Sequence, residues 1–485
     1  MGKTRLQMPR ARLHYLLFLF LVRLDPAFSQ STVKTLPGYP GNLPFKLETG
    51  YIGVGDDEEV QLFYYFIESE NDPSRDPLVL WLTGGPGCSG FSGLIYEIGP
   101  LAFDLENFDG SFPSLILNPY SWTKVASVIF IDSPVGTGFS YANTSKGYNS
   151  SDTKSTKDIY AFMQKWLSIH PMFIKNPLYI SGDSYGGKIV PMVAVEIAKG
   201  NEAGNQPRML LQQGYSVGNS ITDLSKDDNE KIPYAHRMAL ISDEYYELAK
   251  SSCRGEYVNP DPNNILCIFA LQLAKQCTDR VWQNHILEPK CLFITPKPNN
   301  HTWGSHLLDD DPVHDLLFLS KQDAPKCRNY NYVSSYVWMN DETVREALYI
   351  RKGTKGDWKR CNLTLGYESD VESVFRDHQL LNEKGFRTLA YSGDHDMFVP
   401  YLSTLRWIRE LNLTIDSAWR PWTVDGQVAG YTETYKNNKN NEAYITFATV
   451  KASFFIENGA GHTAPEYKPK ECLAMFERWI RLSPL

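Results

Sequence analysis

Several features are missing from this 485-residue sequence, and their absence excludes whole classes of function. No two of its eight cysteines are arranged as Cys-x-x-Cys, so a zinc site or a thioredoxin-like redox site has no support. The formal net charge is −8 and residues 30–485 contain no basic cluster, so nucleic acid is not an expected partner. No Pro/Ser-rich linker, repeat or low-complexity tract divides residues 30–485, which predicts a single domain.

The sequence also lacks an apolar run long enough to span a membrane. The N-terminal run, residues 13–22, is shorter than the roughly 20 residues that a transmembrane helix needs. Small residues in "PAFSQ" follow it, and basic residues precede it: Lys3, Arg5, Arg10 and Arg12. This pattern predicts a signal peptide, residues 1–29. The chain end "RLSPL" is no Lys-Asp-Glu-Leu retention signal. We expect a secretory-pathway protein, vacuolar or extracellular, with no membrane association after signal removal.

The cysteines and sequons fit an oxidising compartment. An even number of cysteines is typical of a disulfide-bonded secreted chain. Asn-x-Ser/Thr sequons are acceptors for N-linked glycans. The sequence offers five of them: Asn143, Asn149, Asn300, Asn362 and Asn412.

Apolar runs and helical patterns alternate along the chain. Residues 46–54 and 60–69 alternate as the strands of an antiparallel hairpin, whereas "PLVLWL" and "SVIFID" are apolar throughout, as in buried parallel strands. Further strands are predicted at "PLYIS", "QQGYSVGN", "FRTLAYSG" and "KASFFIENG", with amphipathic helices between them. From about residue 220 to 325 the pattern gives way to short helical pieces and four cysteines. The sequence therefore predicts an α/β sheet that carries an inserted, cysteine-rich, mainly helical cap.

The stretch "YISGDSYGGKIVP" places Ser184 at the centre of a Gly-x-Ser-x-Gly motif. The motif lies between a predicted strand and a predicted helix, where a sharp turn lifts the serine hydroxyl clear of the sheet. An ordinary serine in a glycine-rich turn is the alternative interpretation. A nucleophile also needs a histidine and an acid.

Both partners are present further along the chain. "YSGDHDMFVP" follows a predicted strand and offers Asp394 and Asp396, and the spacing alone does not separate these two. "GAGHTAPEYKP" follows the next predicted strand and offers His462. The order Ser…Asp…His is that of the α/β-hydrolases. The other histidines of residues 30–485 lack such a setting, and we interpret them as surface or structural.

Glycines also follow the strand "PLVLWL", in "TGGPGCSG". Such a loop lets backbone N–H groups approach a ligand closely, so one oxyanion donor is expected from it. The second is the N–H of Tyr185, directly after the nucleophile. A plain turn is the alternative, but a disulfide at Cys88 would hold the loop in place.

Together these stretches resemble the serine carboxypeptidase family over nearly all of residues 30–485. The matching stretches are "WLTGGPGCSG", "FIDSPVGTGFSY", "YISGDSYGGKIVP", "YSGDHDMFVP" and "GAGHTAPEYKP". The resemblance implies an α/β-hydrolase fold with a cap at about 220–325, and no metal or organic cofactor. It also implies a catalytic triad and two oxyanion donors: Ser184, Asp396 and His462, with Gly85 and Tyr185.

Two positions depart from the peptidases of that family. Where those enzymes use Asn and Glu to hold a peptide's C-terminal carboxylate, this chain has Thr83 and Asp183. Here the sequence is similar to the plant serine carboxypeptidase-like acyltransferases. That resemblance implies an acyl glucose donor, an alcohol acceptor, and transfer of an aromatic acyl group through Ser184. A serine carboxypeptidase or small-ester hydrolase is the main alternative, and a catalytically silent binding protein is a third.

The family also implies a disulfide pattern. The sequence does not determine whether the chain is cut inside the cap into a two-chain form. We expect the pairs Cys88–Cys327, Cys253–Cys267 and Cys277–Cys291. Cys361 and Cys472 are then left as buried thiols.

Overall fold

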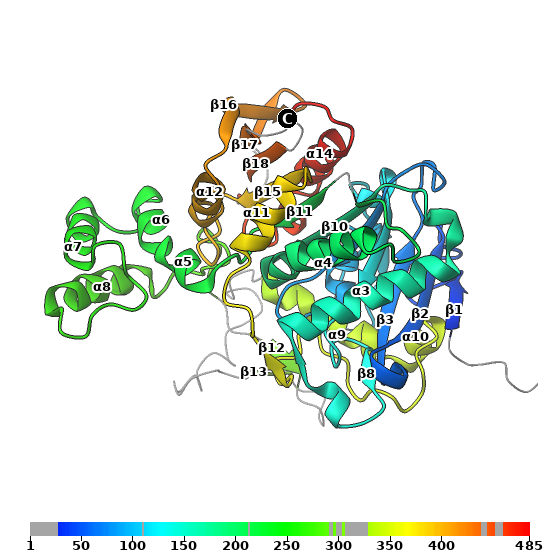
Figure 1. The fold of residues 1–485 in the computed structure, drawn as a ribbon. Helices are drawn as coiled ribbons and strands as arrows, with labels where there is room; N and C mark the ends of the chain where they lie inside the picture. The colour runs from blue at the N-terminus through cyan, green and yellow to red at the C-terminus, as the bar shows by residue number, and fades with distance from the viewer. Residues whose placement is uncertain are drawn as a thin grey trace, which may run out of the picture.

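The computed structural model describes residues 28–108, 111–211, 214–290, 294–296, 303–305, 328–437, 444–451 and 459–485. Within these residues, twelve strands form one large mixed sheet (Figure 1). Its middle is parallel and follows the order β7-β4-β10-β11-β15-β18. These strands comprise Ser127–Ile131, Leu78–Leu82, Leu178–Asp183, Tyr215–Gly218, Thr388–Gly393 and Tyr444–Val450.

Antiparallel strands flank this parallel centre on both sides. One side carries β3 (Val60–Ile67), β2 (Leu47–Val54) and β1 (Phe28–Val33), with the short β8 (Tyr141–Ala142) also paired to β3. The other side carries β17 (Gln427–Lys436) and β16 (Thr414–Val424). The predicted hairpin of residues 46–69 is therefore confirmed.

Helices cover both faces of the sheet, which is why β4, β7, β10, β11 and β15 are buried along their whole length. On one face α3 (Asp152–Ile169) and α4 (Ser184–Glu202) pack side by side (Figure 1). Their apolar residues join those of the sheet in one core cluster. On the other face α9 (Tyr332–Asn340) and α14 (Pro469–Ile480) contribute Trp338 and Phe476 to a second cluster. Burial on both faces explains the absence of polar alternation in β4 and β7.

The C-terminal part of the sheet differs from its prediction. The strand beside β15 is β18, Tyr444–Val450, and it ends before the predicted strand of residues 451–459. Most of that predicted strand, residues 452–458, lies outside the described residues. The sequence reading also missed the β16–β17 hairpin, because β16 is largely exposed along its length and shows no buried face.

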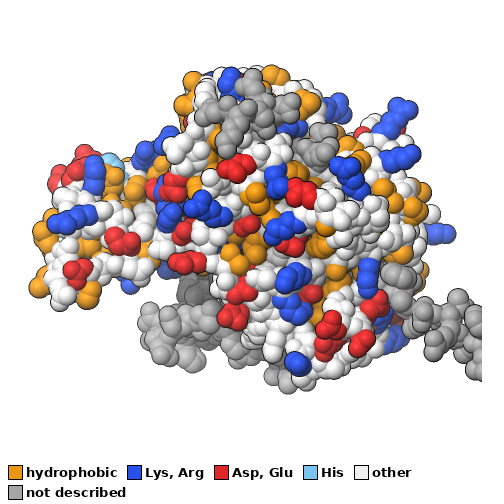
Figure 2. Space-filling model, in the orientation of Figure 1, with side chains coloured by type: hydrophobic (Ala, Val, Ile, Leu, Met, Phe, Trp, Pro, Cys, Tyr) orange, Lys and Arg blue, Asp and Glu red, His pale blue; other side chains and the backbone are white. Residues whose placement is uncertain are grey.

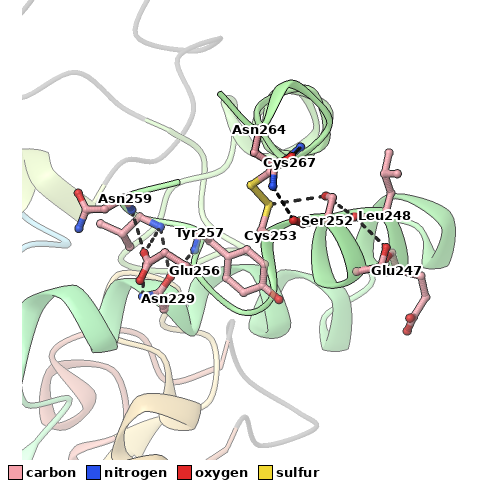
Figure 3. Close-up of a disulfide and its surroundings, with 12 residues drawn as sticks. Asn229, Glu247, Leu248, Ser252, Cys253, Glu256, Tyr257, Asn259, Asn264 and Cys267 are labelled. Carbon is pink, nitrogen blue, oxygen red and sulfur yellow. Dashed lines mark hydrogen bonds between the residues drawn. A yellow bond between two sulfur atoms is a disulfide. The ribbon is translucent and has the colours of Figure 1, made fainter. Parts of the chain in front are cut away.

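The inserted region forms a lobe of short helices that stands away from the sheet (Figure 1). These helices are α5 (Leu224–Asn229), α6 (Lys231–Arg237), α7 (Asp243–Cys253) and α8 (Ile265–Thr278). The predicted disulfide Cys253–Cys267 joins α7 to α8 (Figure 3). Asn264 caps α8 by accepting a hydrogen bond from the Cys267 N–H at 3.1 Å, and donates one to Ser252 O at 2.8 Å. Residues 306–327 lie outside the described part of the chain.

The prediction for Cys88 is wrong. Cys88 forms its disulfide with Cys361, and Cys361 is therefore no free thiol. The physical reason is a backbone bridge: Ser89 N–H donates to Arg360 O at 2.8 Å, and Asn362 N–H donates to Gly87 O at 2.8 Å. These bonds hold the two cysteines opposite each other.

The other cysteines have different outcomes. Cys472 is a buried free thiol on α14, as predicted. The predicted pair Cys277–Cys291 includes Cys291, which lies outside the described residues, as does Cys327.

Three further predictions concern the glycan acceptors, the signal peptide and the lack of a membrane span. Asn143, Asn149 and Asn412 are exposed, whereas Asn362 is half-buried and donates to Gly136 O at 3.1 Å. Asn300 and residues 1–27 of the predicted signal peptide lie outside the described residues. Among the described helices, none has the length and apolar character needed to cross a bilayer. On the face shown in Figure 2, acidic and basic side chains are interspersed over the body and the lobe.

Candidate active site

Ser184 occupies the turn between β10 and α4. Its φ is +53°, a left-handed conformation that costs energy for a residue with a side chain. The turn is held by close packing against β4. A Cβ added at Gly182 would lie 2.4 Å from Leu82 O, and one at Gly186 would lie 2.1 Å from the same atom. Both outer positions of the Gly-x-Ser-x-Gly motif therefore need glycine, and the motif is the strained turn that the sequence predicted.

The three residues predicted as a triad lie in one hydrogen-bonded line. His462 Nε2 is 2.7 Å from Ser184 Oγ. His462 Nδ1 is 2.8 Å from Asp396 Oδ2. Ser184 and Asp396 closely follow the ends of β10 and β15, whereas His462 comes later in the chain, after β18 has ended at Val450. This geometry lets the imidazole take the serine proton while Asp396 fixes the ring orientation.

The structure separates the two aspartates that spacing left open. Asp394 faces the neighbouring ring, with its Oδ1 2.6 Å from His395 Nδ1. Asp396 is fully buried and accepts hydrogen bonds from the N–H groups of Phe398 at 2.8 Å and Val399 at 3.2 Å. These bonds fix the position of the Asp396 carboxylate beside His462.

Asn219 supports Asp396, and the sequence analysis assigned it no role. It follows β11 directly, and its amide donates to Asp396 Oδ2 at 2.8 Å. The side-chain oxygen of Asn219, Oδ1, accepts a hydrogen bond at 3.0 Å from the N–H of Gly393, which ends β15. Its place after a parallel strand was the available signal, because polar residues at the carboxyl ends of such strands converge on one edge.

The electrostatics of His462 suit a base. Burial opposes its protonation, but the Asp396 carboxylate hydrogen-bonded to Nδ1 outweighs this and raises the pKa of His462 above its ordinary value of 6.5. The imidazolium that forms when Ser184 loses its proton is thereby stabilised.

The glycine-rich loop lies against the nucleophile. A Cβ added at Gly84 would lie 2.6 Å from Ser184 Cβ. Gly85 is next along the loop, with a φ of +125° that suits glycine. Tyr185 is the second residue of α4, so its N–H has no acceptor within the helix. The two predicted oxyanion donors thus belong to backbone segments on either side of Ser184.

The Tyr185 side chain is held by a buried ion pair that the sequence analysis did not identify. Its hydroxyl donates to Asp152 Oδ1 at 2.7 Å. Asp152 also accepts from Lys188 Nζ at 3.0 Å, and both charged side chains are fully buried. Tyr185 also lines a small cavity of about 20 Å³, together with Thr83.

Asp183, the residue before Ser184, is hydrogen-bonded to the glycine-rich loop that follows β4. Its Oδ1 accepts a hydrogen bond from Gly84 N–H at 3.3 Å. Burial raises the pKa of Asp183 to about 6, although His462 acts in the opposite direction. Thr83 begins the loop, and its hydroxyl is buried without a hydrogen-bond partner among the described residues. Such a group is expected to find its partner in a ligand or water.

A second buried acid, Glu97, lies behind Asp183 and was also missed. It ends the short helical turn Gly93–Glu97 and is 4% exposed. Burial, followed by the nearby carboxylates of Asp183 and Glu466, raises the pKa of Glu97 well above its ordinary value of 4.5. Burial and the neighbouring carboxylates therefore favour the protonated form of Glu97, which can donate a hydrogen bond.

This protonation predicts a pH-dependent stability. Because the pKa of Glu97 is higher in the folded chain than in the unfolded chain, its stabilising contribution is lost as the pH rises through the folded value. The free energy of unfolding in urea should fall as the pH rises from the ordinary value of 4.5 through the folded pKa, by up to about 1.4 kcal/mol per pH unit. Glu97→Gln cannot ionise and should show a flatter profile. Identical profiles for both proteins would contradict the assignment.

Comparisons with known proteins identify the family of this chain. The serine carboxypeptidase family model matches residues 37–482. Serine carboxypeptidase-like 1 of Arabidopsis thaliana is 48% identical over 472 residues, which cover 97% of this chain and 96% of the relative. The chain belongs to the serine carboxypeptidase family. Serine carboxypeptidase-like 10 of the same plant is 46% identical, with 98% and 99% covered.

The fold has a solved counterpart within the family. The crystal structure of Kex1, a prohormone-processing carboxypeptidase from Saccharomyces cerevisiae, has a TM-score of 0.66. It is 20% identical and covers 93% of this chain and 94% of its own. The predicted α/β-hydrolase fold is therefore confirmed, and family membership makes the chain an enzyme of the serine carboxypeptidase type. In the part of the chain that the structure describes, no group of three or more His, Cys, Asp or Glu residues is placed to hold a metal ion.

Proposed function

We propose that this enzyme transfers an aromatic acyl group from a 1-O-β-glucose ester to an acceptor hydroxyl, through an acyl-enzyme on Ser184. The observation that carries the proposal is the pair Thr83 and Asp183 beside an assembled Ser–His–Asp triad. We also propose that the enzyme works in the secretory pathway, in the vacuole or outside the cell.

Thr83 and Asp183 support a hydroxyl-rich donor better than a peptide carboxylate. A carboxylate has only acceptor atoms, so a site that binds it must supply donors. Thr83 offers one hydroxyl, and the Asp183 carboxylate already accepts from Gly84 N–H. A sugar hydroxyl both donates and accepts, so it can donate to Asp183 and accept from Thr83. Because burial favours the protonated form of Glu97, this neighbouring side chain can add a further donor.

The reaction needs only groups that this chain supplies. His462 takes the proton of Ser184 as Oγ attacks the ester carbonyl, and the oxyanion lies against the N–H groups of Gly85 and Tyr185. The bond to the anomeric oxygen breaks, and His462 returns the proton to the departing glucose. The acceptor hydroxyl then gives its proton to His462 and attacks the acyl-enzyme. Ser184 leaves and regains a proton.

Transfer competes with hydrolysis in the second half of the reaction. Water is present at about 55 M, so the acceptor must be bound and oriented at the acyl-enzyme. Effective molarities of about 10⁵ M or more are available from good positioning. The cap contacts the loop that carries Asp396, since Tyr234 of α6 donates a hydrogen bond to Asp394 O at 2.8 Å.

The decisive experiment measures products and not merely turnover. Purified enzyme is incubated with a panel of aromatic glucose esters, with and without alcohol acceptors, and products are identified by mass. We expect slow release of free acid without acceptor, and mainly a new ester when the alcohol is present. Blocked dipeptides should scarcely be cleaved at mildly acid pH. Efficient release of C-terminal amino acids, with no new ester from any donor, would favour the carboxypeptidase alternative.

A matched variant tests the two residues that carry the proposal. Thr83→Asn with Asp183→Glu installs the residue types that the peptidases of the family use. We expect transfer to fall by about 10-fold or more, because the altered groups no longer match a sugar hydroxyl. The gain in peptidase activity should be modest, since two substitutions do not rebuild the cap. Unchanged transfer in the double variant would show that these positions do not select the donor.

A further inference from the structure

We propose that residues 283–286, within the inserted region, are a positioning element that holds the two triad loops in register, with His285 at its centre. This bridging segment touches no reacting atom. The proposal rests on the catalytic role proposed for the triad, and it is independent of which acyl donor or acceptor the enzyme uses.

The bridging segment is hydrogen-bonded to the loop of Asp396 by its backbone. Gln283 O accepts from Met397 N–H at 2.8 Å and from Phe398 N–H at 3.0 Å. Ile286 N–H donates to His395 O at 3.0 Å. Residues on both sides of Asp396 are therefore fixed to a strip of chain that lies outside the sheet.

The same segment is hydrogen-bonded to the loop of His462. Asn284 O accepts from His462 N–H at 2.8 Å, so the catalytic histidine itself is tied to it. The contact is close: a Cβ added at Gly461 would lie 2.5 Å from Asn284 O and 3.0 Å from His285 Cβ. The glycine before His462 is thus explained by the approach of the bridging segment.

His285 supplies the one side-chain bond between the segment and the His462 loop that the described residues show. Its ring is fully buried, and Nε2 is 2.9 Å from Gly459 O. Nδ1 accepts from Leu287 N–H at 3.2 Å, which places the ring proton on Nε2. Burial lowers the pKa of His285, in keeping with a neutral ring. The ring also packs against those of His395 and Tyr467, with centroid distances of 5.5 and 4.9 Å.

These contacts give the cap a part in catalysis. The imidazole of His462 must meet Ser184 and Asp396 together, and a displacement of about 1 Å can cost 10²-fold in rate. The bridging segment bonds to both loops at once, so it fixes their separation. Asn219 supports Asp396 from the sheet side, whereas the bridging segment supports Asp396 and His462 from the cap side.

The test compares His285→Leu with His285→Gln. Leucine fills the space but leaves Gly459 O without a donor, whereas glutamine presents an N–H near the position of Nε2. We expect leucine to lower kcat by about 10- to 100-fold with KM changed less than about threefold, and glutamine to stay within about fivefold of the parent. A serine-directed phosphonate should label the leucine variant more slowly by a similar factor.

The phosphonate readout separates this proposal from the proposed function, because labelling of Ser184 requires the triad but no acyl glucose. A parent enzyme that is labelled yet transfers no acyl group would contradict the proposed function and leave the bridging segment testable.

His378 is the matched control. It is equally buried, with Nδ1 2.7 Å from Tyr215 Oη, but among the described residues it makes no hydrogen bond to a triad loop. We expect His378→Leu to lower the urea midpoint without slowing the labelling of folded protein.

Three outcomes would overturn the proposal: a folded His285→Leu labelled at the parental rate, equal slowing by leucine and glutamine, or equal slowing by His378→Leu. If His285→Leu does not fold, His285→Asn replaces it, because its shorter amide falls short of Gly459 O. Parity of Asn and Gln would then count against the proposal.

Discussion

Replacement of Ser184 by alanine, or of His462 by alanine, should lower kcat by about 10⁴- to 10⁶-fold while leaving the fold intact. Ser184 Oγ and His462 Nε2 are 2.7 Å apart, and His462 is fixed in turn by Asp396. Ser184 makes the nucleophilic attack and His462 accepts its proton, so loss of either side chain stops the same step.

The measurement joins activity to covalent labelling. A serine-directed phosphonate should modify the parent and not Ser184→Ala, and circular dichroism should be unchanged. The double variant should be scarcely worse than either single variant, because the two residues act as a unit. Labelling of Ser184→Ala at the parental rate would refute the assignment of the nucleophile.

Removal of the disulfide Cys88–Cys361 should destabilise the protein by about 5 kcal/mol in the chain-entropy model. Its two cysteines are 273 residues apart, so reduction frees a very long loop in the unfolded chain. Cys88 also follows the oxyanion loop directly, so we expect the double variant Cys88→Ser with Cys361→Ser to lose activity as well. Urea unfolding and phosphonate labelling measure the two effects.

The second disulfide is the control for the first. Cys253 and Cys267 are 14 residues apart and join two cap helices, so their removal should cost about 3 kcal/mol. Labelling of Ser184 should be nearly unaffected. Non-reducing peptide mapping should link the Cys88 peptide to that of Cys361, and a link to Cys327 would contradict the structure.

The catalytic residues could be predicted from local sequence because their chemistry needs local devices. Gly182 and Gly186 flank Ser184 because the backbone of β4 leaves no room for a side chain. The apolar runs of β4 and β7 could be recognised as strands for a similar reason, since burial on both faces favours apolar residues. The choice of Asp396 over Asp394 came from family resemblance, and the hydrogen bonds supply its physical basis.

Other residues were hidden because their roles depend on partners far along the chain. Asn219 lies 177 residues from Asp396, and Glu97 gains its raised pKa from burial beside Asp183 and Glu466. The partner of Cys88 was mispredicted for the same reason, because a backbone bridge between distant segments brings Cys361 to it. Neither the hydrophobic periodicity nor the residue spacing of the sequence indicates a contact between segments so far apart.

The sequence by itself thus determined the apolar strands β4 and β7, the strained turn at Ser184 and the three catalytic residue types, because each depends on neighbouring residues. Only the tertiary structure decided which cysteine pairs with Cys88, which acids share the buried site, and that His285 lies between the triad loops. Those outcomes depend on how distant segments meet in space, where burial and hydrogen bonding set the free energy of each contact.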